Sequence, residues 1–237
     1  MDVFQCKYTM QEFMAMRKIS GVVFDMDGLM FDTEALIKRT WDIVGPRMGY
    51  EELGHNIYNT LGMNAARRKR YFHDMYGEEF PFEEFTNLYR EEYYIYIEEK
   101  GVPIKEGLFE TLHWMKKRGL KLALATGSSE HNATILLKKA GCYDFFDYKI
   151  FGNMIEKSKP DPEIFQKACI GLGLPCEEVV ALEDSKNGLL SAVNAGLMTI
   201  MIPDLLESAG EMETRIEAKL HSLLEIPDFL EKNTKII

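Results

Sequence analysis

The sequence predicts an α/β protein: a doubly wound, mainly parallel sheet with a helical cap domain inserted into it. Two observations lead to this fold class. Short apolar segments rich in Val, Ile and Leu alternate with segments of helix length, as expected when both faces of a parallel sheet are covered by helices. Between about Phe31 and Val102 the alternation stops, and helix-forming sequence replaces it.

The predicted strands are short and mostly end next to polar residues. In chain order they are Ile19–Asp25, Leu120–Thr126, Tyr148–Phe151, Val179–Glu183 and Met198–Ile202. Ligands of doubly wound sheets bind outside the carboxyl ends of the strands. Residues at these strand ends are therefore the first candidates for function.

Helix-length segments lie between the later strands. They are Gly107–Arg118, Ser129–Ala140, Pro162–Leu172 and Lys186–Ala195. Gly119, Gly141 and Gly196 follow three of them, and glycine is the usual residue at a helix C-terminus. Pro162 suits the first position of its helix.

The inserted region is predicted to form a cap of helices. These are Thr33–Val44, Glu51–Thr60, Asn64–Tyr76 and Phe82–Glu99, with Asp32 or Thr33 as the N-cap of the first. We expect a helical cap domain over residues 31–103 and an α/β core over residues 16–30 and 104–237. Residues 1–15 are expected to be a dispensable N-terminal extension, because translation from Met16 would begin Met-Arg-Lys and run directly into the first predicted strand. The part after Pro203 is expected to be an amphipathic helix and a tail of little functional content.

The overall composition excludes several classes of protein. The 237 residues are 46% hydrophobic and 28% charged, as in ordinary globular proteins. A net charge of −10 argues against nucleic acid or an anionic membrane as partner, and no apolar run approaches the roughly 20 residues of a membrane span. The cysteines lack metal-site spacing, which predicts reduced thiols in a cytoplasmic protein; they are Cys6, Cys142, Cys169 and Cys176. No protein partner is predicted.

The first strand delivers two carboxylates, Asp25 and Asp27, followed by Gly28, which permits a sharp turn. Like charges this close favour a bound cation. We interpret Asp25 as a nucleophile and Asp27 as its acid/base partner, with a divalent metal ion beside them. The alternative is a strand followed by an ordinary Asp-Gly turn.

Three further polar segments follow later strands and should meet these acids at one sheet edge. They are Thr126-Gly127-Ser128, Lys159-Pro160 and Glu183-Asp184-Ser185. Carboxylates, a hydroxyl, loop amides and an ammonium group suit phosphoryl transfer with Mg²⁺, which prefers oxygen ligands. The alternatives are that the first and last segments only cap helices, and that Lys159 is solvated, with Lys157 as a rival lysine.

Together these motifs resemble those of the haloacid dehalogenase-like (HAD) phosphohydrolases that carry a helical cap, over residues from about 17 to 210. This branch includes phosphoglycolate phosphatases, sugar-phosphate phosphatases and β-phosphoglucomutase. The resemblance implies that Asp25 is the phosphorylated nucleophile and Asp27 the general acid/base. It also implies a magnesium site and a phosphate site. Mg²⁺ would be bound by Asp25, the Asp27 carbonyl and Asp184 with support from Glu183, and phosphate by Thr126, Gly127, Ser128 and Lys159.

Within the family the sequence favours a Mg²⁺-dependent phosphatase acting on a small phosphorylated metabolite. Dehalogenases lack the second acid, which is present here as Asp27. β-Phosphoglucomutases carry a His and an Arg in the cap, and the matching positions here are Ile37 and Ala65. Arg67 or Arg68 could replace the arginine after a shift in alignment, but nothing replaces the His, so a mutase is the runner-up. A non-enzymatic binding protein is disfavoured because the catalytic positions are all occupied.

Specificity is expected in the cap and its turn around Leu61–Asn64, and the sequence does not name the substrate. The basic run 67–70 is interpreted as a solvated helix face, with a cap arginine that reaches the substrate as the alternative.

Overall fold

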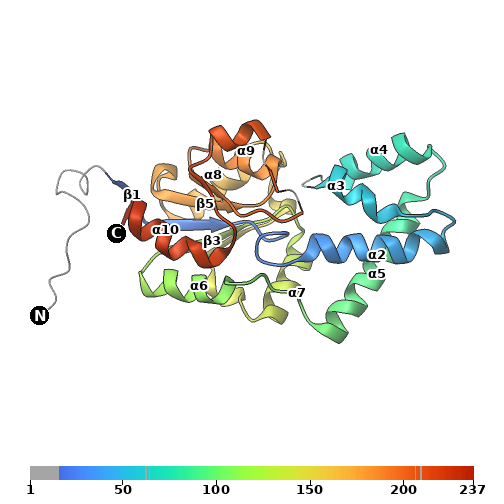
Figure 1. Ribbon diagram of the computed structural model, residues 1–237, viewed down its shortest axis with the longest axis horizontal. Coiled ribbons are helices and arrows are strands. Elements are labelled where there is room, and N and C mark those ends of the chain that lie inside the picture. The colour runs from blue at the N-terminus through green and yellow to red at the C-terminus, as the bar shows by residue number, and fades with distance from the viewer. Residues whose placement is uncertain (1–15, 62, 64, 206, 209) are drawn as a thin grey trace, which may run out of the picture.

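The computed structural model describes residues 16–237 except 62, 64, 206 and 209, and the chain forms two lobes (Figure 1). One lobe surrounds a parallel sheet, and the other consists of helices. The predicted N-terminal extension lies outside the described residues. The boundaries proposed for the two domains stay a prediction.

The larger lobe is built on a six-stranded sheet in the order β4-β3-β2-β5-β6-β7, in which every neighbouring pair is parallel. The strands are β2 Gly21–Phe24, β3 Lys121–Ala125, β4 Tyr148–Ile150, β5 Val179–Glu183, β6 Met198–Met201 and β7 Ala218–Lys219. The five predicted strands are all present. β2 lies inside the sheet, with Val22 aligned to Leu122 on one side and to Val180 on the other.

Helices cover both faces of this sheet, because alternate side chains of each strand point to opposite faces. Val22 and Phe24 pack with α6, α7 and α10, whereas Val23 packs with α8 and α9. These helices are α6 Leu108–Lys117, α7 Glu130–Ala140, α8 Glu163–Leu172, α9 Lys186–Asn194 and α10 Ile226–Asn233. The predicted doubly wound α/β fold is thereby confirmed.

The first predicted strand is two strands that meet at Ser20. Before Ser20, β1 (Arg17–Ile19) pairs in parallel with β8 (Thr234–Ile236), and after it β2 joins the main sheet. The Ser20 amide donates to the carbonyl of Glu178, the residue just before β5, at 2.9 Å, which fixes the junction between the two strands.

The segment after Pro203 is therefore more than the expected helix and tail. It supplies β7, α10 and β8, and Leu230 of α10 is fully buried in the main core. Short 3₁₀ turns complete the core: η2 Tyr143–Phe145, η3 Gly152–Met154, η4 Cys176–Glu178, η5 Gly210–Thr214 and η6 Leu223–Glu225. Cys142, Cys169 and Cys176 are free thiols.

The helical lobe has its own aromatic core. Trp41 and Phe85 both pack on Phe72, with ring centroids 5.3 and 5.1 Å from it. The elements are α2 Thr33–Arg47, η1 Leu53–Asn56, α3 Ile57–Thr60, α4 Ala65–Tyr76 and α5 Phe82–Lys100. The two connections to the core meet where Phe31 bridges to Ile104.

Two local predictions about this lobe are wrong. The single helix expected over Glu51–Thr60 is the 3₁₀ turn η1 followed by the short α3, and Glu52 just before η1 has a left-handed backbone conformation. Asp32 occupies the N-cap position of α2, but its side chain makes no capping hydrogen bond, and the Thr33 hydroxyl donates to Asp27 instead of accepting from the helix. No helix among the described residues is both long and apolar enough to span a bilayer.

Candidate active site

The carboxyl ends of β2, β3 and β5 bring the polar residues together, as parallel strands must. The Asp25 amide donates to the Leu182 carbonyl, so the β2–β5 ladder continues to the first acid. Thr126 directly follows β3, and Glu183 is the last residue of β5. Because these strands lie inside the sheet, Asp25 is only 7% exposed and Thr126 and Glu183 are fully buried.

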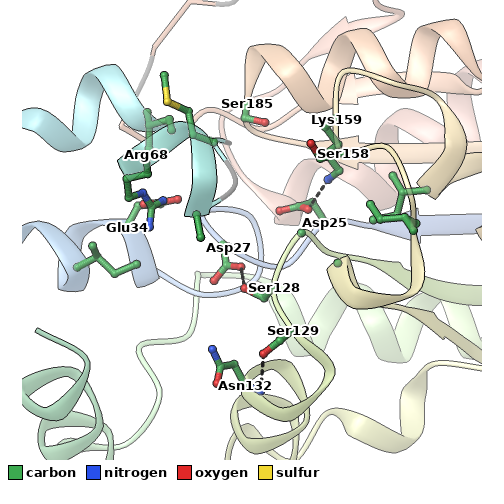
Figure 2. Close-up of a pocket in the computed structure, with 18 of the residues that line it drawn as sticks. Asp25, Asp27, Glu34, Arg68, Ser128, Ser129, Asn132, Ser158, Lys159 and Ser185 are labelled. Atoms are coloured by element: carbon green, nitrogen blue, oxygen red, sulfur yellow. Dashed lines mark hydrogen bonds and ion pairs between the residues drawn. The ribbon is translucent and has the colours of Figure 1, made fainter. Parts of the chain in front are cut away.

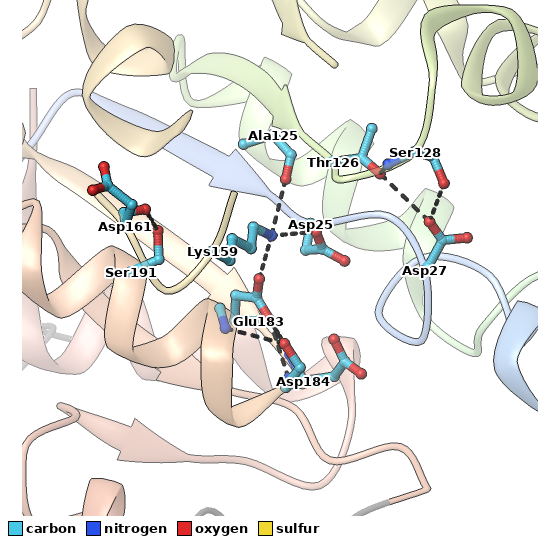
Figure 3. Close-up of polar contacts among 12 residues, drawn as sticks. Asp25, Asp27, Ala125, Thr126, Ser128, Lys159, Asp161, Glu183, Asp184 and Ser191 are labelled. Atoms are coloured by element: carbon cyan, nitrogen blue, oxygen red, sulfur yellow. Dashed lines mark hydrogen bonds and ion pairs between the residues drawn. The ribbon is translucent and has the colours of Figure 1, made fainter. Parts of the chain in front are cut away.

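Lys159 reaches this edge from the loop between β4 and α8. A cis peptide bond joins Lys159 to Pro160. Its Nζ lies 2.5 Å from an oxygen of Asp25, 2.5 Å from one of Glu183 and 3.2 Å from the Ala125 carbonyl (Figure 3). The rival Lys157 has a side chain 73% exposed and pairs with Asp161 at 3.9 Å. Of the two lysines, the structure brings Lys159 to the predicted site.

Both oxygens of the Glu183 carboxylate accept hydrogen bonds. Oε1 accepts from Lys159, and Oε2 accepts from the amides of Asp184 and Ser185 and from the Ser185 hydroxyl, at 3.0 to 3.1 Å. Gly188 packs against this carboxylate so closely that a Cβ there would overlap it. Glu183 therefore positions Lys159 and the loop that carries Asp184.

Three buried carboxylates could hold a metal ion. Asp25, Glu183 and Asp184 each offer an oxygen, and these oxygens lie within 4.8 Å of one another. Burial, followed by the charges of Glu183 and Asp25, raises the pKa of Asp184 well above its ordinary value. Burial also raises the pKa of Asp25 to about 8, although the Lys159 ammonium acts in the opposite direction.

This donor set fits a divalent cation such as Mg²⁺, which prefers oxygen ligands and would offset the crowded negative charge. Since Glu183 already bonds to Lys159 and two amides, Asp25 and Asp184 are the better candidates for direct ligands. Gly28 has a φ of +84°, and a Cβ at this position would overlap the Asp184 carboxylate. The glycine thus lets the turn after β2 pass close to the cluster.

The Asp27 side chain belongs to a second, neighbouring group. Its Oδ1 accepts from the Thr33 hydroxyl at 2.8 Å, and its Oδ2 accepts from the hydroxyls of Ser128 at 2.7 Å and Thr126 at 3.4 Å. Figure 3 shows Asp27 turned toward Ser128, on the other side of Asp25 from Glu183. The structure therefore divides the predicted site residues into a cluster around Asp25 and a group around Asp27.

The loop after β3 opens into the site. The Thr126 hydroxyl accepts from the Ser128 amide at 3.0 Å, and Gly127 lines the pocket. The N-cap of α7 is Ser129, whose hydroxyl accepts from the Asn132 amide. The capping alternative for residues 126–128 is therefore wrong. Ser185 does cap α9, because its hydroxyl accepts from the Gly188 amide at 3.1 Å.

A cavity of about 470 Å³ joins these groups to the helical lobe. Asp25, Asp27 and Lys159 lie at its core end, and Glu34 and Arg68 line it from the cap (Figure 2). Ile37 and Ala65 line it as well.

Sequence reasoning missed Asp204 and Glu34. The Asp204 side chain is 6% exposed, pairs with Lys105 at 2.5 Å and lies beside Gly28. It follows β6, so the strand-end rule applied to the fifth strand would have found it. Glu34, 8% exposed, lies in the first turn of α2, where an acid is ordinary, and no sequence signal marks its burial.

The model of the haloacid dehalogenase-like hydrolases matches residues 19–196. The chain is 30% identical to the Bacillus subtilis protein YhcW, over 82% of this chain and 94% of that one. It is 29% identical to the phosphorylated carbohydrates phosphatase of Thermotoga maritima, over 90% of this chain and 97% of that protein. The crystal structure of CbbY from Rhodobacter sphaeroides in complex with phosphate superposes with a TM-score of 0.73 at 27% identity. The superposition covers 88% of this chain and 96% of that one. Family, site geometry and fold agree, and the chain belongs to the haloacid dehalogenase-like hydrolases.

Proposed function

We propose that this protein hydrolyses a small phosphomonoester in a Mg²⁺-dependent reaction, with Asp25 as the nucleophile. The observation that carries the proposal is the position of Asp25: a buried carboxylate at a strand tip, in contact with the Lys159 ammonium and close to Asp184, on the wall of a cavity. The names of the relatives support a phosphate ester as substrate, since one is a phosphorylated carbohydrates phosphatase.

The reaction has two steps. In the first, an Asp25 oxygen bonds to phosphorus as the bond from phosphorus to the leaving oxygen breaks, and Asp27 gives that oxygen its proton. In the second, Asp27 takes a proton from water, whose oxygen bonds to phosphorus while the bond to Asp25 breaks. Asp25 is regenerated and inorganic phosphate leaves. The hydroxyls of Thr33 and Ser128 hold Asp27 next to Asp25.

Phosphate is assigned to the loop after β3 and to Lys159. The Thr126 hydroxyl and the amides of Gly127 and Ser128 lie just before the N-terminus of α7, where the helix dipole favours an anion. Lys159, already between two carboxylates, adds a cation that stabilises charge on the transferring oxygens.

The metal ion is assigned to Asp25, Asp184 and the backbone carbonyl of Asp27, with Glu183 supporting the set. When bound, Mg²⁺ would supply positive charge that reduces the repulsion between the nucleophile and the anionic substrate. Glu183 acts indirectly, because it orients Lys159 and the Asp184 loop through hydrogen bonds.

A sugar-phosphate mutase is the second candidate. Ile37 and Ala65 line the cavity at the positions where mutases carry a His and an Arg, and neither can act as a base or bind phosphate. Arg68 lines the same cavity and is the observation that keeps this candidate open. An assay for isomerisation of glucose 1-phosphate decides between them.

The proposed function is tested by measuring free phosphate from a panel of phosphorylated metabolites with Mg²⁺. We expect release by the wild type, its loss in EDTA, and a loss of at least about 10³-fold in Asp25→Asn. Asp144→Asn, an exposed substitution on the core, is the matched control. Activity that persists in EDTA or in Asp25→Asn would contradict the mechanism. A protein that binds a partner without turnover would keep that affinity in Asp25→Asn.

A further inference from the structure

The cap end of the cavity contains polar atoms that lack a partner. Glu34 Oε2, Arg68 Nε and Thr86 Oγ1 are each buried without a hydrogen bond to any described residue, and all three residues line the cavity that contains Asp25. Buried polar atoms in folded proteins are nearly always hydrogen-bonded. Three orphaned atoms on residues that line the same cavity therefore point to a ligand that supplies the partners.

Glu34 is held at a fixed place relative to the proposed chemistry. It lies in the first turn of α2, and the preceding Thr33 donates to the Asp27 carboxylate at 2.8 Å. Figure 2 shows Glu34 and Arg68 together on the cap side of Asp27. A group bound by Glu34 would therefore belong to the part of the substrate that leaves with Asp27's proton.

The three side chains match the hydrogen-bonding capacity of hydroxyl groups. A carboxylate only accepts, a guanidinium only donates, and the Thr86 hydroxyl does both. An alcohol can donate to Glu34 while it accepts from Arg68, and neighbouring hydroxyls can engage Thr86 as well. An apolar leaving group would leave all three buried atoms unpaired, which a polar site rejects strongly.

Charge argues against a second phosphate at this end. The Arg68 guanidinium would attract one, but the Glu34 carboxylate lies beside it and offsets its charge. The charges of Asp27 and Asp204 also act at Glu34, so the electrostatic potential there is more negative than Glu34 and Arg68 alone would make it. Arg90 lines the cavity too, but its side chain is exposed. An uncharged, hydroxylated group fits this end better than an anion.

We propose that Glu34, Arg68 and Thr86 form a hydroxyl-binding subsite that selects monophosphate esters of sugars or polyols. The subsite disfavours bisphosphates and esters whose leaving group has no other hydroxyl. This inference rests on the proposed phosphatase activity and adds to it the residues that choose the leaving group.

The test compares three esters at pH 8: sorbitol 6-phosphate, fructose 1,6-bisphosphate and p-nitrophenyl phosphate. Glu34→Gln should lower kcat/KM for sorbitol 6-phosphate at least about tenfold and change that for p-nitrophenyl phosphate less than about threefold. The ratio of bisphosphate to monophosphate kcat/KM should rise in the same variant, because a negative charge has been removed. Glu84→Gln, an exposed substitution on α5, is the control and should change none of these values.

Thr86→Val provides an independent measurement on a smaller group, and each variant's melting temperature shows whether it is folded. Thr86→Val should lower kcat/KM for sorbitol 6-phosphate more than that for p-nitrophenyl phosphate, as expected for Glu34→Gln. If Glu34→Gln does not fold, the selectivity of Thr86→Val decides. Equal losses for both monophosphates, or no loss for either, would overturn the subsite while leaving the phosphatase intact. Failure of the wild type to release phosphate from any ester would overturn the subsite and the proposed function together.

Discussion

Replacing Lys159 by methionine removes a buried cation and keeps most of the apolar stem. The ammonium touches Asp25 and Glu183, both at 2.5 Å, and its side chain is only 9% exposed. Breaking a buried ion pair by removing one partner costs about 3–5 kcal/mol. We expect the lower end, about 3 kcal/mol at pH 8, because the remaining carboxyls can take up protons. For a chain of this size that corresponds to a fall of roughly 6–12 °C in Tm.

The assay is urea and thermal unfolding of the metal-free protein at pH 8 and pH 5.5. The loss should be smaller at pH 5.5, since Asp25, with a pKa raised to about 8, is then protonated and no longer needs the cation. Lys157→Met is the matched control, because its ammonium is exposed and 3.9 Å from its partner. If Lys159→Met and Lys157→Met unfold alike at pH 8, Lys159 does not hold the cluster together and the electrostatic reasoning fails.

Three further results are expected. Gly188→Ala should weaken Mg²⁺ binding about 10- to 100-fold by calorimetry, because a Cβ would displace Glu183. The Tm of the protein in EDTA should fall from pH 5 to pH 8: folded Asp184 keeps a proton that the unfolded chain releases near pH 4, so stability decreases as pH rises. Lys105→Met should cost about 1–3 kcal/mol in urea unfolding, because it leaves Asp204 buried without its ion pair.

Each of these has a result that would contradict it. Unchanged Mg²⁺ affinity in Gly188→Ala would show that Glu183 can move without cost. A Tm that rises over the same pH range would mean that the carboxyls are better stabilised in the folded protein than in the unfolded chain. For Lys105, the exposed Lys100→Met on α5 is the control, and equal unfolding curves for the two variants would exclude a stabilising role for the ion pair.

The positions of the site residues could be predicted because they follow from local pattern. Three of the five predicted strands end at a polar residue, and parallel pairing alone brings these residues, Asp25, Thr126 and Glu183, to one edge. Which oxygen faces which partner could not be predicted. That Asp27 turns to Thr33 and Ser128 depends on how the cap approaches the core.

Elements with few local signals were missed for the same reason. β8 has three residues and is a strand because it pairs with β1, which lies at the other end of the sequence. The split of the first strand at Ser20 follows from that pairing. Glu34 reads as a solvated first-turn acid, and its burial arises only when α4 and α5 cover the cavity. Tertiary contacts decide all three.

The placement of β2 between β3 and β5 bears on the order in which the chain folds. The neighbours of β2, which Asp25 directly follows, begin at Lys121 and Val179, so most of the protein must be synthesised before β2 is hydrogen-bonded on both edges. Joining such distant segments is entropically costly and slow. Trp41, Phe72 and Phe85, by contrast, can meet as soon as α5 has emerged from the ribosome. We therefore expect the helical lobe to gain structure first and the sheet edge that carries the candidate site to assemble last.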